Sequence, residues 1–337
     1  MVPGPNVPFP PMEAELVSGL PIGGGWQYEP KWDGFRGVLE NDGGELALWS
    51  RNGRPLLRYF PELREVGALL PPHSALDGEI VISRDGRLEF DLMQMRLHPA
   101  ESRVRKLAAE TPAELVVFDL LLWDGEKVHE LPLEERRARV DGLDGFRISP
   151  ASRDEEQARA WLATLESAGL DGVVAKRLGL PYLPGSRDGV VKVKEHKTAD
   201  CVVVGVRWKE KGVRLATLLL GLHRDDGGID YVGSAAVGAR VHDQILETVR
   251  PLLEGAPDRG FSEPNRWGGG ELAESALRPE LVAEVRYDKV QGHRFRHGTR
   301  LLRFRPDKDA AQCTWREVRP PRRPDDPTVE SLLAAAG

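Results

Sequence analysis

Short apolar segments separated by turn residues run through the whole chain, and they limit its fold more than any other feature. The turn sequence Asn41-Asp42-Gly43-Gly44 stands between two such segments, which predicts a hairpin. Similar segments elsewhere have the length and apolar content of buried strands. In the first half of the chain, strands are expected at residues 26–30, 37–41, 45–50, 76–82 and 115–122.

Residues 154–168 form the clearest helix, because their apolar side chains recur at helical spacing. Ser152 or Asp154 can cap the start of this helix, and Gly169 can end it. Helix and strand mix along the chain without a regular strand–helix–strand repeat. The pattern therefore predicts an α+β fold and argues against a doubly wound sheet.

The pattern changes near residue 198, where short strand-like segments with Gly-rich turns begin. They lie at residues 202–206, 216–223, 229–232, 281–287 and 301–305, with one helix expected at 241–253. Several short strands with one helix suit a small, partly closed barrel such as an OB-fold, a common platform for nucleic acids. We therefore expect one domain at 1–198, a second at 199–319, and a C-terminal tail at 320–337 that contains a Pro-rich linker and a short helix.

Composition excludes several classes of protein. Hydrophobic residues make up 40% and charged residues 30% of the 337 residues, which is typical of soluble globular chains. No apolar run has the length of a membrane span, and the Pro-rich start lacks the pattern of a secretory signal. Cys201 and Cys313 are far apart and have no metal-ligand spacing, so we expect buried apolar thiols in a reducing bacterial cytoplasm.

The net charge of −6 does not exclude nucleic-acid binding, because the local density of cations decides it. Residues 286–308 carry two acids, Asp288 and Asp307, against a larger set of cations. That set is Arg286, Lys289, Arg294, Arg296, Arg300, Arg303, Arg305 and Lys308.

The motif Lys31-Trp32-Asp33-Gly34-Phe35-Arg36 places a lysine at the end of an expected strand. Such a loop can present an amine as a nucleophile, and its glycine allows the backbone to approach a phosphate closely. Taken alone, the motif equally describes an exposed lysine in a charged turn.

Further short motifs follow this lysine in a fixed order, and their joint occurrence changes its meaning. Each brings a charged or aromatic side chain to the end or face of an expected strand. They are Ser50-Arg51-Asn52-Gly53, Asp77-Gly78-Glu79, Val116-Val117-Phe118-Asp119, Asp171-Gly172 with Lys176, Val191-Lys192-Val193-Lys194 and Arg303-Phe304-Arg305-Pro306-Asp307-Lys308. Lys192 and Lys194 share one face of their strand, since alternate residues do.

Together these motifs resemble those of the covalent nucleotidyltransferase superfamily. Within it, the chain is similar to the ATP-dependent DNA ligases, and most of all to the short bacterial ligase C type. The resemblance implies an ATP-grasp-like adenylation domain followed by an OB-fold domain. It also implies ATP and Mg²⁺ or Mn²⁺ as cofactors, nicked double-stranded DNA as substrate, repair proteins as partners, a monomer, and an association with the nucleoid.

By this resemblance, Lys31 attacks the α-phosphate of ATP and forms a phosphoramide, and Asp33 orients the nucleophile loop or the metal. Lys192 and Lys194 neutralise charge that builds on the phosphate. The nucleotide would be held by Glu29 at the adenine edge, by Phe118 stacked on the base, and by Arg36, Arg51 and Glu79 at the ribose and phosphate end, where Arg187 would join the phosphate contacts. Lys176 is a further residue expected to bind the nucleotide.

Glu79 and Asp171 are the carboxylates expected near the metal, because Mg²⁺ prefers oxygen ligands. Arg305, Asp307 and Lys308 would orient the pyrophosphate and move away once Lys31 is adenylated. Two positions depart from the family pattern: the acid at 171 is more often Glu, and the residue at Val190 is commonly aromatic.

Other interpretations stay open. Phe118 could belong to the core, Glu79, Lys192 and Lys194 could be solvated surface groups, and Arg305 could be part of a general DNA-binding patch. The chain could also be an RNA ligase or an RNA-capping guanylyltransferase of the same superfamily. A nucleic-acid-binding protein that has kept the fold and lost the chemistry is the alternative from another class.

Overall fold

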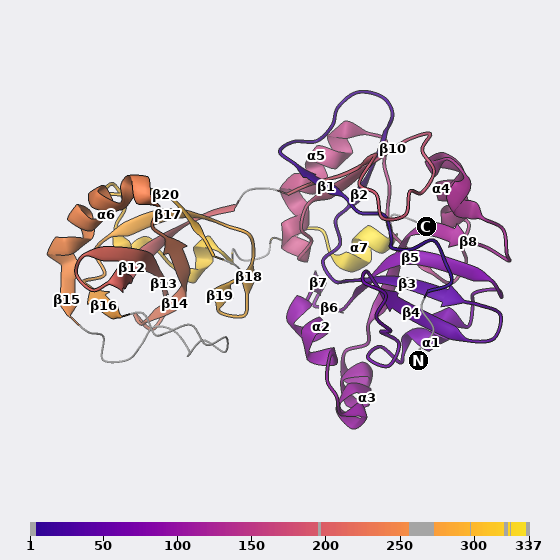
Figure 1. Ribbon diagram of the computed structural model, residues 1–337, viewed down its shortest axis with the longest axis horizontal. Helices are drawn as coiled ribbons and strands as arrows, with labels where there is room; N and C mark the ends of the chain where they lie inside the picture. Colours follow the sequence, from indigo (N-terminus) through magenta and orange to yellow (C-terminus); the bar gives the residue numbers. More distant parts are fainter. Residues whose placement is uncertain are drawn as a thin grey trace. The chain divides into compact units, whose positions relative to one another are not determined.

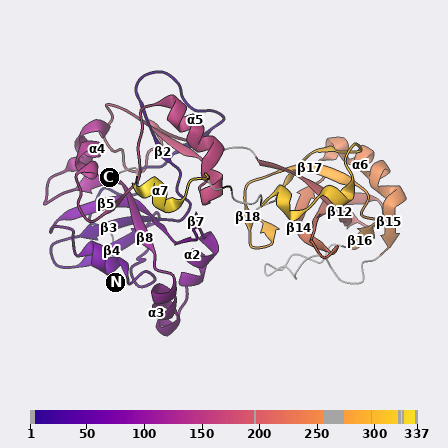
Figure 2. The same cartoon turned by 180° about the vertical axis from the view of Figure 1, so that it is seen from behind.

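The computed structural model describes residues 5–194, 197–255, 273–296, 298–319, 323 and 325–334. Contacts within the chain divide it into two units, Met1–Glu195 with Arg323–Gly337, and His196–Arg322. Both are drawn from opposite sides in Figures 1 and 2. The limits expected from the sequence, 1–198, 199–319 and 320–337, differ from these units in two ways. Strand β12 already begins at Lys197, and the end of the chain belongs to the first unit.

Two sheets form the framework of the first unit, a five-stranded sheet in the order β4-β3-β5-β8-β9 and a four-stranded sheet in the order β1-β11-β10-β2. The first comprises β4 (Leu46–Ser50), β3 (Phe35–Asn41), β5 (Ser74–Val81), β8 (Glu114–Leu122) and β9 (Arg147–Ile148). The second comprises β1 (Glu15–Val17), β11 (Val190–Val193), β10 (Val173–Arg177) and β2 (Trp26–Pro30). A two-stranded ribbon joins β6 (Ser83–Arg84) to β7 (Arg87–Leu88). The predicted hairpin of β3 and β4 is confirmed.

The helices of the first unit are α1 (Leu63–Gly67), α2 (Phe90–Arg96), α3 (Glu101–Glu110), α4 (Leu133–Asp141), α5 (Glu155–Thr164) and α7 (Val329–Ala334), with short 3-10 turns at Val128–Glu130 and Leu165–Ala168. The predicted helix at 154–168 is α5 and the turn after it. Asp154 caps α5 by accepting a hydrogen bond from the Glu156 backbone, and Gly169 ends the segment in the left-handed conformation.

Helix α7 packs on the first unit although it comes at the end of the chain. Its Val329 and Leu332 side chains are buried in a cluster with Trp161, Leu165 and Tyr28. The Val329 backbone also donates to the Gly86 carbonyl over 3.0 Å. Figures 1 and 2 both show α7 among the elements of the first unit. Helix formation was predicted here, but the docking was not.

The second unit is a curved sheet built around the long strand β12 (Lys197–Glu210). One edge of β12 pairs with β13, while the other pairs first with β17 and then with β16, which curls the sheet into a partly closed barrel. The other strands are β13 (Arg214–His223), β14 (Ile229–Ala236), β15 (Leu253–Gly255), β16 (Glu274–Leu277), β17 (Val282–Tyr287), β18 (Val290–Gln291), β19 (Arg294–Phe295) and β20 (Arg300–Phe304). Helix α6 (His242–Val249) and 3-10 turns at Ala239–Val241, Arg250–Leu252, Ala310–Gln312 and Trp315–Glu317 complete it.

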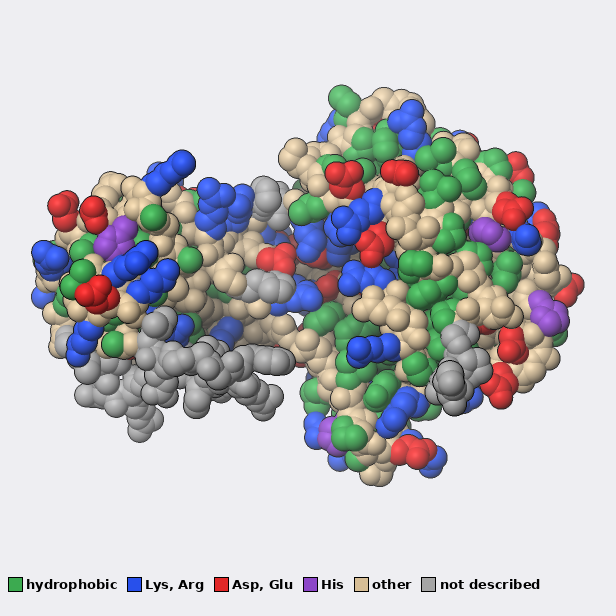
Figure 3. Space-filling model, in the orientation of Figure 1, with side chains coloured by type: hydrophobic (Ala, Val, Ile, Leu, Met, Phe, Trp, Pro, Cys, Tyr) green, Lys and Arg blue, Asp and Glu red, His purple; other side chains and the backbone are tan. Residues whose placement is uncertain are grey.

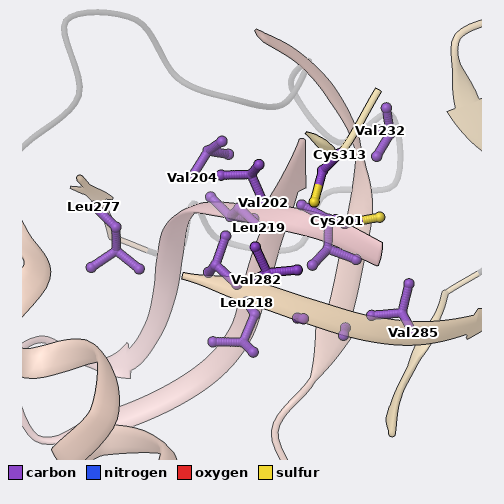
Figure 4. Close-up of a cluster of buried hydrophobic side chains, with 14 of the residues drawn as sticks. Cys201, Val202, Val204, Leu218, Leu219, Val232, Leu277, Val282, Val285 and Cys313 are labelled. Carbon is purple, nitrogen blue, oxygen red and sulfur yellow. The ribbon is translucent and has the colours of Figure 1, made fainter. Parts of the chain in front are cut away.

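A single apolar cluster fills this barrel. Val202, Leu218 and Val282 lie at its centre, and Cys201 and Cys313 are fully buried among such side chains (Figure 4). Burial raises the pKa of the Cys201 thiol well above its ordinary value. The prediction of buried apolar thiols is therefore confirmed, as are the α+β class and the small barrel. In the part of the chain that the structure describes, no helix is long and apolar enough to cross a membrane.

Candidate active site

Lys31 directly follows β2 and is fixed by backbone hydrogen bonds to the start of β10. Its backbone N–H donates to the Gly172 carbonyl over 2.9 Å, and the Asp171 N–H donates to the Lys31 carbonyl over 3.1 Å. Gly172 has a φ of 120°, and a Cβ there would lie 2.1 Å from the Val193 carbonyl oxygen, so only glycine fits. The position of Lys31 is thus fixed by the end of β2, by the start of β10, and by the end of β11 that packs against Gly172.

The side chain of Asp171 brings two lysines together. Lys31 Nζ lies 2.9 Å and Lys194 Nζ 2.5 Å from its Oδ2 atom. Burial is the largest influence and raises the pKa of Asp171, but Lys31 and then Lys194 together outweigh it and lower this pKa to about 2. The carboxylate therefore stays ionised at neutral pH and holds both ammonium groups.

Lys192 adds a third cation to this group. It is half-buried on β11, and partial burial, followed by the charges of Lys31 and Lys194, lowers its pKa. A group of three neighbouring cations is stabilised by an anion, which a phosphate supplies. Figure 3 shows Lys and Arg side chains gathered on this face of the first unit around β1, with acidic side chains among them.

A second group of candidate site residues surrounds Phe118, whose ring is in contact with two cations. Its ring is half-buried although Val117 and Asp119 on either side are buried. Arg36 Cζ lies 4.6 Å and Lys176 Nζ 4.9 Å from the ring centroid. Phe118 belongs to no apolar cluster of the described residues, so it is placed as a partly open aromatic face rather than a core side chain.

Glu29 of β2 and Lys176 of β10 form a diagonal ion pair, since Lys176 is paired in register with Gln27. Lys176 Nζ lies 2.9 Å from Glu29 Oε1 and donates to the Phe118 carbonyl over 3.0 Å. Gln27 donates to the same Glu29 oxygen over 2.8 Å. Glu29 is 2% exposed, so its charge requires this pairing.

Arg36 is held by a buried network that the sequence analysis missed. Its guanidinium donates to both oxygens of Asp77 and to the Met12 carbonyl. Asp77 also accepts a hydrogen bond from the Tyr182 hydroxyl over 2.7 Å, and that hydroxyl accepts from the Met12 N–H over 2.8 Å. The network closes a ring of four residues, each from a different part of the chain. Asp77 had been noted only as the first residue of the motif that contains Glu79.

Glu79 lies beside the nucleophile loop. Its Oε1 accepts the Gly34 N–H over 3.1 Å. A Cβ on Gly34 would lie 1.9 Å from the Ile80 carbonyl oxygen, which explains the glycine. Burial raises the pKa of Glu79 to about 7 against the opposing charges of Arg36 and Lys31, and buried Asp33 raises it further.

Arg51 and Arg187 are exposed and lie near an acid that the sequence analysis also missed. Arg187 Nη2 pairs with Glu13 Oε2 at 2.9 Å. This hydrogen bond lowers the pKa of Glu13, with help from the charges of Arg51 and Lys192. The charge of Arg187 also helps to lower the pKa of Lys192, whereas Arg51 acts on Glu13. Among the described residues, neither arginine forms a hydrogen bond or ion pair with Lys31.

Arg305, Asp307 and Lys308 lie in the second unit, which is described by itself. Arg305 pairs with Asp307 at 2.8 Å and with Asp200 at 3.1 Å, and Lys308 pairs with Asp200 at 2.9 Å. The hydrogen bond from Arg305 lowers the pKa of Asp307 to about 2. These three residues are therefore assembled with one another and with Asp200, which the sequence analysis did not single out.

Two family models match the chain: the ATP dependent DNA ligase domain over residues 12–194, and the ATP dependent DNA ligase C terminal region over residues 211–308. The chain is 42% identical to DNA ligase C1 of Mycolicibacterium smegmatis, over 93% of this chain and 94% of that protein. It is 40% identical to DNA ligase C of Mycobacterium tuberculosis over the same shares.

Two further similarities are more distant. The chain is 30% identical to the multifunctional non-homologous end joining DNA repair protein LigD of Mycobacterium tuberculosis, over 89% of this chain and 37% of that protein. A solved structure from an analysis of Lig E DNA ligases has a TM-score of 0.50 at 16% identity and covers 87% of this chain and 100% of that one. It shares the fold.

The paired sheets and the lysine-centred site define a covalent nucleotidyltransferase, an enzyme that uses a nucleoside triphosphate. The chain belongs to the family of ATP-dependent DNA ligases, and it is of the short bacterial ligase C type. The predicted family, fold and class of enzyme are thus confirmed.

Proposed function

We propose that this ligase joins 3′-hydroxyl and 5′-phosphate ends at nicks in double-stranded DNA in three steps. First, Lys31 loses a proton to solvent, and its neutral Nζ attacks the α-phosphorus of ATP. A P–N bond forms, pyrophosphate leaves, and the nitrogen gives up a second proton to solvent. Next, an oxygen of the DNA 5′-phosphate attacks the same phosphorus and releases the lysine. Last, the 3′-hydroxyl attacks the 5′-phosphorus of the DNA, and AMP leaves.

One observation carries this proposal: the Lys31 ammonium is held with Lys194 on a single Asp171 oxygen, beside Lys192. A carboxyl whose pKa is about 2 is a weak base at neutral pH, so Asp171 aims the amine rather than taking its proton. Lys192 and Lys194 would stabilise the charge that develops on the phosphate oxygens.

Phe118 would stack on the adenine, with Glu29 and Lys176 at the edge of the base. A Phe118→Ala change is expected to raise the KM for ATP in adduct formation about tenfold, because stacking on an aromatic side chain contributes about 1–3 kcal/mol. Rates of adduct formation at varied ATP concentration measure this. Phe118→Tyr keeps the ring face and should stay within about twofold of the wild type. An equal loss in both variants would contradict the stacking role.

Glu79 and Asp171 would hold a divalent cation such as Mg²⁺ or Mn²⁺. The described residues contain no group of three or more His, Cys, Asp or Glu side chains placed to hold a metal ion by themselves. These two carboxyl groups are nevertheless chemically suited to such an ion. The charge of Glu79 is costly without a nearby cation, and Mg²⁺ takes one or two carboxylates together with substrate phosphates. When bound, the ion would neutralise phosphate charge.

The raised pKa of Glu79 predicts a dependence of adduct formation on pH. A free carboxyl with a pKa of about 7 is protonated below that pH and must lose its proton before it can bind a cation. When Mg²⁺ is sub-saturating, the rate should therefore fall as the pH drops through 7. Glu79→Gln should remove this acid limb and leave a lower, flatter profile. Initial rates of adduct formation at saturating ATP and sub-saturating Mg²⁺ measure it, and excess Mg²⁺ should shift the limb to lower pH. An unchanged acid limb in Glu79→Gln would assign the limb to another group.

The second unit would supply Arg305, Asp307 and Lys308 to the pyrophosphate, and basic stretches of both units would contact DNA phosphates. Binding should therefore be salt-sensitive and largely independent of sequence. A role in DNA repair, with repair proteins as partners, is supported by the similarity to LigD.

The proposal is tested by transfer without free ATP. The protein is incubated with ATP labelled on the α-phosphate, separated from free nucleotide, and added to nicked duplexes of DNA or RNA. Label is expected to remain on the denatured protein, to move to the DNA 5′-phosphate, and to be released as AMP when the nick closes. Preferred sealing of nicked RNA would favour an RNA ligase, and absence of bound label would favour a binding protein without chemistry.

A further inference from the structure

Two acidic side chains lie directly opposite each other on neighbouring strands of the second unit. Asp200 of β12 is paired in register with Glu284 of β17. Like charges at directly opposed positions of an antiparallel pair destabilise a sheet. Asp200 is 8% exposed, so solvent offsets little of this cost. The arrangement therefore needs cations close by.

Three cations contact these two acids, and all of them lie on β20 or in the segment that follows it. Arg303 Nε lies 2.6 Å from Glu284 Oε2. Arg305 Nη1 lies 3.1 Å from Asp200 Oδ2 and 3.9 Å from Glu284 Oε2. Lys308 Nζ lies 2.9 Å from the same Asp200 oxygen as Arg305. Among the described residues of the second unit, Asp200 is thus the one carboxylate that touches both cations proposed to act on pyrophosphate.

Two carboxylates fix the plane of the Arg305 guanidinium. Asp307 accepts from Nε over 2.9 Å and from Nη2 over 2.8 Å, while Asp200 accepts from Nη1. Arg305 has five N–H donors, and these contacts take three of them. Lys308 has three donors, of which Asp200 and Glu317 take two. Within the described part of the second unit, both cations thus keep donors for a phosphate.

We infer that Asp200 is a positioning residue for the first step, because it sets the spacing and direction of Arg305 and Lys308. This rests on the proposed function. Without the Asp200 charge, the two cations would repel each other, and Lys308 would be held by Glu317 while Arg305 would be held by Asp307. Each would keep a partner, but their shared point of attachment would be lost. Glu284 supports the arrangement through Arg303.

The test separates the step that releases pyrophosphate from the step that does not. Asp200→Asn keeps the side-chain shape and removes its charge, and Asp200→Glu restores the charge. The matched control is Glu274→Gln. It breaks the ion pair between Glu274 of β16 and Arg207, which lies on β12 like Asp200, and it leaves the contacts of Asp200, Arg305 and Lys308 in place. Each full-length variant is measured for adduct formation from ATP and for joining of a nick that already carries AMP on its 5′-phosphate.

Asp200→Asn is expected to slow adduct formation about 100-fold, since a small misplacement of a catalytic group costs that much. Joining of the pre-adenylated nick should change by no more than about twofold, and Asp200→Glu should recover about a tenth or more of the adduct rate. Glu274→Gln should match the wild type in both assays.

Two outcomes would overturn the inference. An equal loss in both steps, or a loss shared with Glu274→Gln, would assign Asp200 a structural or DNA-binding role. Normal adduct formation in Asp200→Asn, while Arg305→Ala is slow, would show that Asp200 does not position Arg305 but would leave the proposed function intact. Failure of the proposed function itself would appear separately, as wild-type protein that forms no adduct.

Discussion

Replacing Lys31 with arginine is expected to abolish adduct formation and ATP-dependent nick sealing, with a loss of at least about 1,000-fold in rate. Arginine keeps the positive charge and can still pair with Asp171, but its guanidinium stays protonated and cannot serve as the nucleophile. Joining of a nick that already carries AMP should survive in this variant, because the last step does not use the amine.

The measurement compares both activities in Lys31→Arg with those in Lys127→Arg. Lys127 is exposed and pairs with Glu130, so the same substitution there should leave both rates unchanged. Adduct formation by Lys31→Arg at a rate near that of the wild type would exclude Lys31 as the nucleophile. Loss of both steps would point to a folding defect.

Replacing Asp77 with alanine is expected to lower the free energy of unfolding of the first unit by about 3–5 kcal/mol, because it leaves Arg36 as an uncompensated charge. It also removes the acceptor of the Tyr182 hydroxyl. Tyr182→Phe, which removes hydrogen bonds but no charge, should cost about 1–3 kcal/mol. The two effects should not add, since both residues belong to one network.

Urea denaturation of the full-length variants measures these differences, and the transition of the first unit is identified by its shift when ATP is added. The control is Glu126→Gln, which breaks an exposed pair with Arg139 and should cost less than about 1 kcal/mol. A cost for Asp77→Ala no larger than that of the control would contradict the assignment of a stabilising network.

The sequence predicted those helices and hairpins whose formation depends on residues that are neighbours in the chain. The hairpin of β3 and β4 follows from its turn residues, and helix α5 follows from apolar spacing and its cap at Asp154. The strands that contain Glu79 and Phe118, and the strand that ends just before Lys31, were likewise predicted.

The missed features all depend on contacts between distant parts of the chain. Tyr182 donates to Asp77 across 105 positions, and its hydroxyl accepts from Met12 across 170. Helix α7 returns to the first unit after the whole barrel, and Asp200 meets Lys308 across 108 positions. A single sequence contains no local signal for such pairings, since the residues become neighbours only when the sheets have formed.

The central claim is that the Lys31 amine becomes joined to AMP before DNA is bound. It is tested most directly by mass spectrometry of proteolytic peptides after incubation with ATP and Mg²⁺ in the absence of DNA, under neutral or alkaline conditions that preserve a phosphoramide. We predict that the peptide containing Lys31 gains the mass of one AMP less one water, with the modification at Lys31 itself. AMP found on another residue, or nick sealing by protein that carries none, would contradict the account.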